Sequence, residues 1–147
     1  MQASVVSWLF AALVLAWLGA RLWLWTRQIR HVARHRGQVP GAFAGTIALD
    51  KHQLAADYTI AKARLALLAM AFGAAVTLAW TLLGGLDALN TALRDALHAR
   101  FGPMAYQLAL LTAFTLIGSL LELPFDLYST FVVEQRFGFN RMTPRLY

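Results

Sequence analysis

The sequence contains no cysteine and little charge. Without cysteine the chain has no disulfide bond and no thiolate chemistry, and its redox compartment cannot be inferred. Charged residues make up 14% of the chain and apolar residues 59%, whereas soluble domains have about 25% and about 45–50%. This composition excludes an ordinary soluble domain and indicates a chain whose solvent is lipid.

The apolar residues are gathered into three runs. The first, residues 5–25, contains one charged residue, Arg21, and the other two, residues 65–86 and 104–121, contain none. Each run has about 18–22 residues, close to the ~20 that an α-helix needs to cross a hydrocarbon core of about 30 Å. The sequence therefore predicts an all-α integral membrane protein with three transmembrane helices. These spans are expected at about 5–25, 63–86 and 104–125.

A secretory signal peptide is the alternative for the first run. A signal peptide has a basic segment before an apolar core of about 7–15 residues. Here residues 1–4 carry no charged side chain, the apolar run is longer, and the basic residues follow it. The pattern predicts a retained span with its N-terminus outside.

Basic residues divide unevenly among the connecting segments, and short loops rich in Lys and Arg stay in the cytoplasm. Segments 26–61 and 127–147 are net basic, whereas 87–100 carries two basic and two acidic residues. This alternation predicts a cytoplasmic loop at 26–61, an outer loop at 87–102 and a cytoplasmic C-terminus.

The sequence supports neither a nucleic-acid partner nor a metal site. The net charge of +6 comes mostly from membrane edges, without basic and aromatic residues interleaved on a polar face, so no nucleic-acid partner is expected. His31 and His35 are four residues apart, as zinc ligands on a helix are. The glutamate of an HExxH motif is absent between them and the flanking arginines repel a cation, so no metal ligand is predicted in this chain.

The cytoplasmic loop is expected to be partly helical. Asp50 and Gln53 resemble a capping box, and apolar residues recur at helical spacing from Leu54 onward. We therefore expect a helix that starts near residue 51, with Asp50 as its N-cap, and runs into the second span.

Small residues lie in register on the second span. Ala66, Ala69, Gly73 and Thr77 share one helix face. Small side chains let helices approach closely in a bilayer, so this face is expected to pack against another helix.

The third span carries polar residues at intervals of three and four, which places them on one helix face. This polar stripe consists of Thr112, Thr115, Ser119, Glu122 and Asp126. It is expected to face protein or water, because lipid penalises an unpaired charge by several kcal/mol. The two carboxylates have three open roles: a solvated helix end, an ion pair with an arginine of the basic loops, or substrate contact and proton handling. Pro124 between them predicts a bend.

The C-terminal segment predicts a helix-turn corner. Residues 127–137 are compatible with an amphipathic helix, Gly138 suits a left-handed C-cap, and Phe139 is placed to contact the end of that helix. Thr143 and Pro144 form a typical helix start. Because the chain stops three residues later, we expect these 147 residues to be the front of a longer protein.

Two segments carry a resemblance to a known family. Residues 123–143, LPFDLYSTFVVEQRFGFNRMT, resemble the motif after the third membrane helix of the type I CAAX prenyl proteases. Residues 39–65, VPGAFAGTIALDKHQLAADYTIAKARL, are similar to the segment before that family's second membrane helix. The resemblance implies no catalytic role for the motif residues, which shape the cytoplasmic corner. They are Glu134, Phe137, Gly138, Phe139, Asn140 and Thr143.

The resembled proteases are integral-membrane zinc metallopeptidases, so the resemblance implies an enzyme for the full-length protein. It implies an HExxH helix beyond residue 147, with histidines that bind zinc and a glutamate that activates water. Residues 1–147 would be the N-terminal membrane domain, inactive alone, which walls the intramembrane chamber and supports the catalytic helices. The implied partners are the lipid bilayer, the protein's own C-terminal catalytic region and a peptide or protein substrate.

Two other classes of function stay open at this point. One is a non-catalytic, three-span assembly subunit, and the other is a fragment of a transporter in which residues 112–126 line a polar path. A composition rich in Ala, Leu and Arg suggests a bacterial relative and therefore the bacterial inner membrane. Such a relative need not process prenylated proteins.

Overall fold

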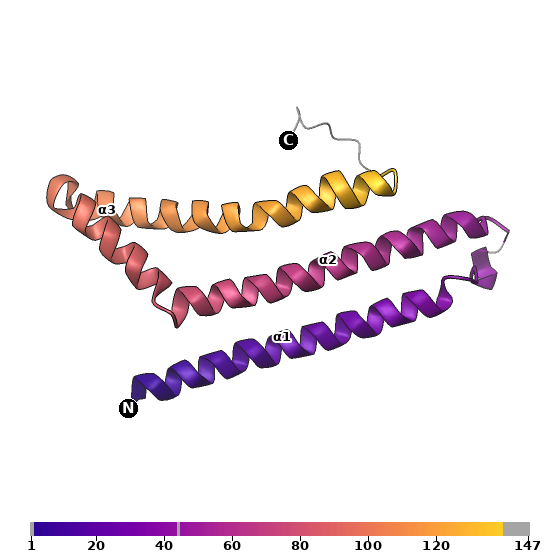
Figure 1. Ribbon diagram of the computed structural model, residues 1–147, viewed down its shortest axis with the longest axis horizontal. Helices are drawn as coiled ribbons and strands as arrows, with labels where there is room; N and C mark the ends of the chain where they lie inside the picture. Colours follow the sequence, from indigo (N-terminus) through magenta and orange to yellow (C-terminus); the bar gives the residue numbers. More distant parts are fainter. Residues whose placement is uncertain (1, 44, 140–147) are drawn as a thin grey trace. The chain divides into compact units, whose positions relative to one another are not determined.

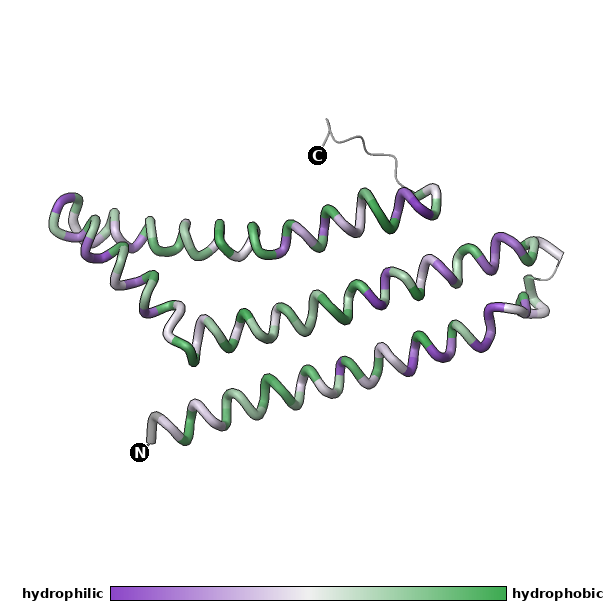
Figure 2. Tube along the Cα trace, in the orientation of Figure 1, coloured by the Kyte–Doolittle hydropathy of each residue, from purple (hydrophilic) through white to green (hydrophobic). Residues whose placement is uncertain are grey.

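The structure is a computed structural model, and it describes residues 2–43 and 45–139. The described residues form helices and no strand, which confirms the all-α prediction (Figure 1). In chain order the elements are α1 (Gln2–His35), the short 3-10 helix η1 (Gly41–Phe43), α2 (Leu49–Thr81), α3 (Gly85–Tyr128) and the π-helix η2 (Ser129–Glu134). Three helices in this part of the chain are long and apolar enough to cross a membrane, as predicted (Figure 2).

The first two helices are longer than a membrane crossing requires. α1 has 34 residues and α2 has 33, so each is roughly 50 Å long at 1.5 Å per residue. A hydrocarbon core is about 30 Å thick. The loop expected at 26–61 is therefore mostly helical, and it shrinks to residues 36–48. Arg, Gln and Ile tolerate the helical conformation, so α1 continues until Gly37 and Pro40 end it.

The start of α2 corrects the predicted cap. The helix begins at Leu49, and Asp50 lies in its first turn instead of at the N-cap. The carbonyl of Ala48 accepts the first helical hydrogen bond, from the His52 N–H at 3.1 Å. Asp50 still favours the helix, because its carboxylate lies near the positive end of the helix dipole.

The segment expected to form the outer loop, 87–102, is helical up to Gly102. α2 ends at Thr81, earlier than the expected limit at residue 86, and α3 begins at Gly85 after a turn through Gly84 (φ 79°). Leucine recurs in this segment at intervals of three and four residues, a pattern typical of an amphipathic helix. These leucines are Leu86, Leu89, Leu93 and Leu97.

Gly102 separates this helical segment from the apolar part of α3. Its backbone angles, φ 81° and ψ 175°, are the non-helical ones inside α3, and Pro103 follows it at the start of the next helical stretch. A bend is predicted at Pro124; α3 continues through this residue with helical backbone angles, and the helix changes to the π-helical form at Ser129, where η2 begins.

The chain divides into two compact units. The first contains, among the described residues, 2–15 and 72–124. Within it, the rings of Trp80 and Phe114 pack edge to face with centroids 5.3 Å apart, and the Tyr106 hydroxyl donates to Asn90 Oδ1. The second unit contains residues 16–71 and, among those described, residues 125–139. It holds the sequence segments of greatest functional interest.

The buried side of α2 differs from the predicted small-residue face. Ala56, Ala63 and Ala74 are buried, whereas Gly73 and Thr77 are exposed. Nothing lies within 4 Å of a Cβ placed on Gly73. The buried alanines are seven and eleven residues apart, which also places them on one helix face. Several faces of α2 carry small residues, and the face that is buried is the one with Ala56, Ala63 and Ala74.

We predict that Gly102→Ala destabilises the chain by about 1–3 kcal/mol, since its backbone region is essentially open to glycine alone. Chemical unfolding in a mild detergent measures the change. Gly118→Ala is the matched control, because Gly118 lies in a helical part of α3 with open space around it. Equal unfolding midpoints for the two variants would contradict the proposed strain at Gly102.

Candidate functional site

The end of the described chain forms the predicted corner. Gly138 adopts φ 75°, the left-handed conformation that favours glycine. Its N–H donates to the carbonyl of Gln135 at 3.1 Å, and the Phe139 N–H donates to the carbonyl of Glu134 at 2.9 Å. These two bonds are the Schellman pattern, so the C-cap predicted at Gly138 is confirmed. The motif residues Asn140 and Thr143 lie outside the described residues.

Side chains of three motif residues meet side chains of α2 at this corner, in one cluster. Lys62 Nζ donates to Glu134 Oε1 at 3.1 Å. The Tyr58 ring packs edge to face against the Phe137 ring, with ring centroids 5.6 Å apart, and its centroid lies 4.7 Å from that of the Phe139 ring. We call this group the motif cluster. It consists of Tyr58, Lys62, Glu134, Phe137 and Phe139, and its two parts come from α2 and from the chain beyond α3 (Figure 1).

The motif cluster joins the two sequence segments that carry the family resemblance. Tyr58 and Lys62 belong to the segment 39–65, and they are four residues apart, so they share one face of α2. Their partners belong to the segment 123–143. Phe139, which we expected to contact the end of its own helix, lies against Tyr58 of α2.

The aromatic contacts contribute at least as much to the motif cluster as the ion pair does. The side chains of Lys62 and Glu134 are 44% and 27% exposed, and such pairs stabilise by about 0.2–1 kcal/mol. Each aromatic pair adds about 0.5–1.5 kcal/mol beyond its buried area. Val133, next to Glu134, is one of the few buried side chains of the unit, at 6% exposure. The ion pair therefore mainly sets the register, and the rings supply most of the attraction.

A second polar link ties the segment after α1 to α2. Arg36 binds Asp57 through two bonds, Nε to Oδ1 at 2.6 Å and Nη2 to Oδ2 at 2.7 Å. The hydrogen bonds to Asp57 raise the pKa of Arg36 above its ordinary value. His52 Nε2 lies 3.2 Å from the carbonyl oxygen of His35, at the end of α1. Both partners of the ion pair are exposed, so it orients the turn more than it stabilises the fold.

The polar stripe lies on α3. All five of its residues, 112 to 126, are exposed. Thr115 Oγ1 donates to the carbonyl of Leu111 at 2.9 Å, within its own helix. Across the part of the chain that the structure describes, neither Glu122 nor Asp126 is in an ion pair.

The described residues do not fit a zinc site. No three His, Asp or Glu side chains among residues 2–43 and 45–139 gather closely enough to hold a metal ion. The sequence also contains no HExxH. We therefore assign no metal-dependent step to the residues of this chain.

Sequence reasoning missed Tyr58, Lys62, Arg36 and Asp57 as parts of the site. The opposite charges of Lys62 and Glu134 were visible, but 72 residues separate them. One sequence gives no means of pairing them over that distance.

Comparison with known proteins decides the family. Residues 28–147 match the family model of the CAAX prenyl protease N-terminal region, which is described as five membrane helices. The chain belongs to this family. The probable CAAX prenyl protease 1 of Schizosaccharomyces pombe is a relative with 29% identity over 136 residues, which cover 86% of this chain and 28% of the relative. No solved structure matches the chain significantly.

Membership of the CAAX prenyl protease N-terminal family confirms the resemblance. The match includes the whole motif cluster and the end of α1. The chain spans less than a third of the length of its fission-yeast relative.

We predict that Tyr58→Ala lowers the free energy of unfolding by about 1–3 kcal/mol, because it removes two aromatic pairs. Tyr58→Phe keeps both rings in contact and should change stability by less than about 0.5 kcal/mol. Chemical unfolding in a mild detergent compares the two. Equal losses in both variants would show that the rings do not hold the motif cluster together.

Proposed function

We propose that this chain is the N-terminal membrane domain of a zinc-dependent membrane endopeptidase of the CAAX prenyl protease type. The observation that carries the proposal is the family match over residues 28–147, which contains the motif cluster. In this proposal the domain walls an intramembrane chamber and supports catalytic helices that this chain lacks. The zinc, the HExxH helix and the hydrolysis of a peptide or protein substrate belong to the protein's own C-terminal catalytic region.

The motif cluster supports the proposed scaffold role. Tyr58 and Lys62 of α2 hold the residues on both sides of the Gly138 turn, from Glu134 to Phe139. This fixes the direction in which the chain leaves its third long helix. A catalytic region attached there would inherit that direction, and small errors of placement are expensive in catalysis, since about 1 Å can reduce the rate 100-fold.

The polar stripe supports the proposed chamber wall. Its five residues are exposed on a helix that also exposes large apolar side chains such as Leu111, Leu116 and Leu120. In a bilayer, polar side chains face protein or water. The family description counts five membrane helices, two more than the three candidate spans of the described chain. We assign the stripe to the chamber side and to contacts with the additional helices.

The charge pattern supports an orientation for the domain. The basic stretches at the end of α1 and around Arg136 favour the cytoplasmic side, which leaves the N-terminus outside. The composition favours a bacterial inner membrane as the location.

The direct test uses the reading frame beyond Tyr147, which we expect to encode an HExxH motif. The full-length protein should hydrolyse a membrane-proximal peptide, 1,10-phenanthroline should abolish the activity, and added zinc should restore it. Residues 1–147 alone should show no hydrolysis. Undiminished activity after removal of the metal, or hydrolysis by the isolated chain, would contradict the proposal.

The scaffold role predicts a charge-swap rescue in the full-length protein. Lys62→Glu places two carboxylates together and should lower kcat about tenfold through misplacement of the motif segment. The double variant Lys62→Glu/Glu134→Lys should recover most of that loss. Lys51→Glu, the same change at an exposed position of α2, is the control and should stay near wild type. A swap that recovers nothing would show that the ion pair does not position the catalytic part.

A further inference from the structure

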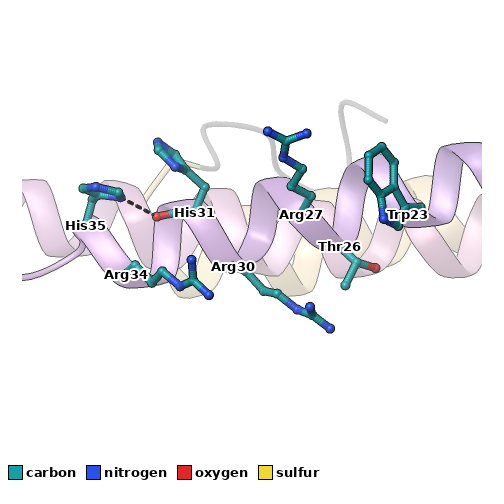
Figure 3. Close-up of a pocket in the computed structure, with 7 residues that line it drawn as sticks. All are labelled: Trp23, Thr26, Arg27, Arg30, His31, Arg34 and His35. Carbon is teal, nitrogen blue, oxygen red and sulfur yellow. Dashed lines mark hydrogen bonds between the residues drawn. The ribbon is translucent and has the colours of Figure 1, made fainter.

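The end of α1 carries a basic surface that the proposed function leaves unused. Trp23, Arg27, Arg30 and Arg34 follow one another at intervals of four, three and four residues, so they share one side of the helix. We call these four residues the basic face. Figure 3 shows two rows along this stretch of α1, with Trp23 and Arg27 projecting to one side and Arg30 and Arg34 to the other. The Arg27 guanidinium lies 5.7 Å from the centre of the Trp23 ring.

The basic face borders an open hollow of about 450 Å³. Its lining contains arginine and histidine but no carboxylate; the residues are Trp23, Thr26, Arg27, Arg30, His31, Arg34 and His35. No acidic residue occurs anywhere in residues 1–49. Among the described residues, the carboxylate that forms an ion pair near this end of α1 is that of Asp57, and its partner is Arg36. The three arginines of the basic face therefore have no ion-pair partner within the part of the chain that the structure describes.

The basic face points away from the helix that packs against α1. Val32 lines a second hollow with Ala55 and Ala56 of α2, which His31 and His35 also border, so this side of α1 faces α2. Arg34 is two residues further, about 200° around the helix axis at 100° per residue. Arg27, Arg30 and Arg34 are all exposed. An anionic partner for them would therefore come from outside the described residues.

Position and chemistry together identify that ligand. The basic face begins at Trp23, at the end of the apolar run of α1, where tryptophan marks the membrane interface. Arginine presents a planar fork of donors that matches the oxygens of a phosphate group. Trp23 and Leu24 are exposed, and they precede the arginines on the side of the apolar run. They therefore lie at the depth where the first carbons of a lipid acyl chain would contact them. A phosphate that carries acyl chains can contact both the arginines and the apolar side chains, whereas a soluble phosphate can contact only the arginines.

We propose that the basic face binds the phosphate headgroup of an anionic phospholipid. The arginines hold the headgroup oxygens, and Trp23 lies at the level where the acyl chains begin. This fixes the depth of α1 in the bilayer. The proposal does not depend on the peptidase assignment, because binding is measured without any hydrolysis.

The test is native mass spectrometry of the whole chain from a mild detergent, with phosphatidylglycerol and phosphatidylcholine of identical acyl chains. Wild type should retain phosphatidylglycerol preferentially. Each basic residue near an anionic surface strengthens binding roughly fivefold, so the triple variant Arg27→Gln/Arg30→Gln/Arg34→Gln should bind it at least tenfold more weakly. The triple lysine variant keeps the charge and loses the forked geometry, so it should retain an intermediate affinity.

The control variant removes three other exposed charges, Arg64→Gln/Arg94→Gln/Arg100→Gln, and should bind like wild type. Circular dichroism should give equal helix content for all variants. Equal retention of the two lipids, or equal losses in the two glutamine variants, would overturn the proposal. Displacement of phosphatidylglycerol by an equal concentration of soluble glycerol phosphate would also overturn it, because the site would then recognise free phosphate.

Discussion

The lipid bilayer offers no hydrogen-bond partner for the backbone, and this constraint governs the rest of the structure. Each membrane segment must satisfy its own N–H and C=O groups, so the long apolar runs are helices. The apolar side chains then have no reason to turn inward, because lipid is as apolar as a protein core. Among the described residues the buried ones are three alanines and Val133, while large residues such as Trp8, Leu68 and Leu116 are exposed.

The ion pairs are consequently found where the helices extend beyond the apolar runs. Within the second unit, Arg36 pairs with Asp57 at one turn and Lys62 pairs with Glu134 at the corner. Placing a polar group at a hydrated helix end costs less free energy than placing it in hydrocarbon. The polar contacts that set how the helices align and where the chain leads are therefore made at the helix ends. The helices α1 and α2, each roughly 50 Å long, provide the length needed for such ends.

Two surfaces of the domain are left for partners, and their chemistry differs. The polar stripe of α3 combines hydroxyls with carboxylates amid apolar residues, which suits other helices of the same protein. The basic face of α1 carries guanidinium groups beside tryptophan, which suits lipid headgroups.

Local features were predictable from the sequence. Hydropathy sets the three candidate spans, because the thickness of the bilayer requires a fixed number of apolar residues. The C-cap at Gly138 was predictable as well, since the left-handed torsion depends on one residue and its neighbours. The helix at 85–101 was not predicted, because the segment lies between two apolar runs and was assigned as the connection between them, although the leucine spacing favours a helix.

Only the tertiary structure decided which faces meet. The burial of Ala63 and Ala74, in place of exposed Gly73, depends on the rotation of α2 about its axis, and several rotations fit the sequence equally well. The pairing of Lys62 with Glu134 joins residues 72 positions apart. Spacing along the chain says which side chains share a helix face, but contacts between helices also depend on how each is turned and shifted against its neighbour.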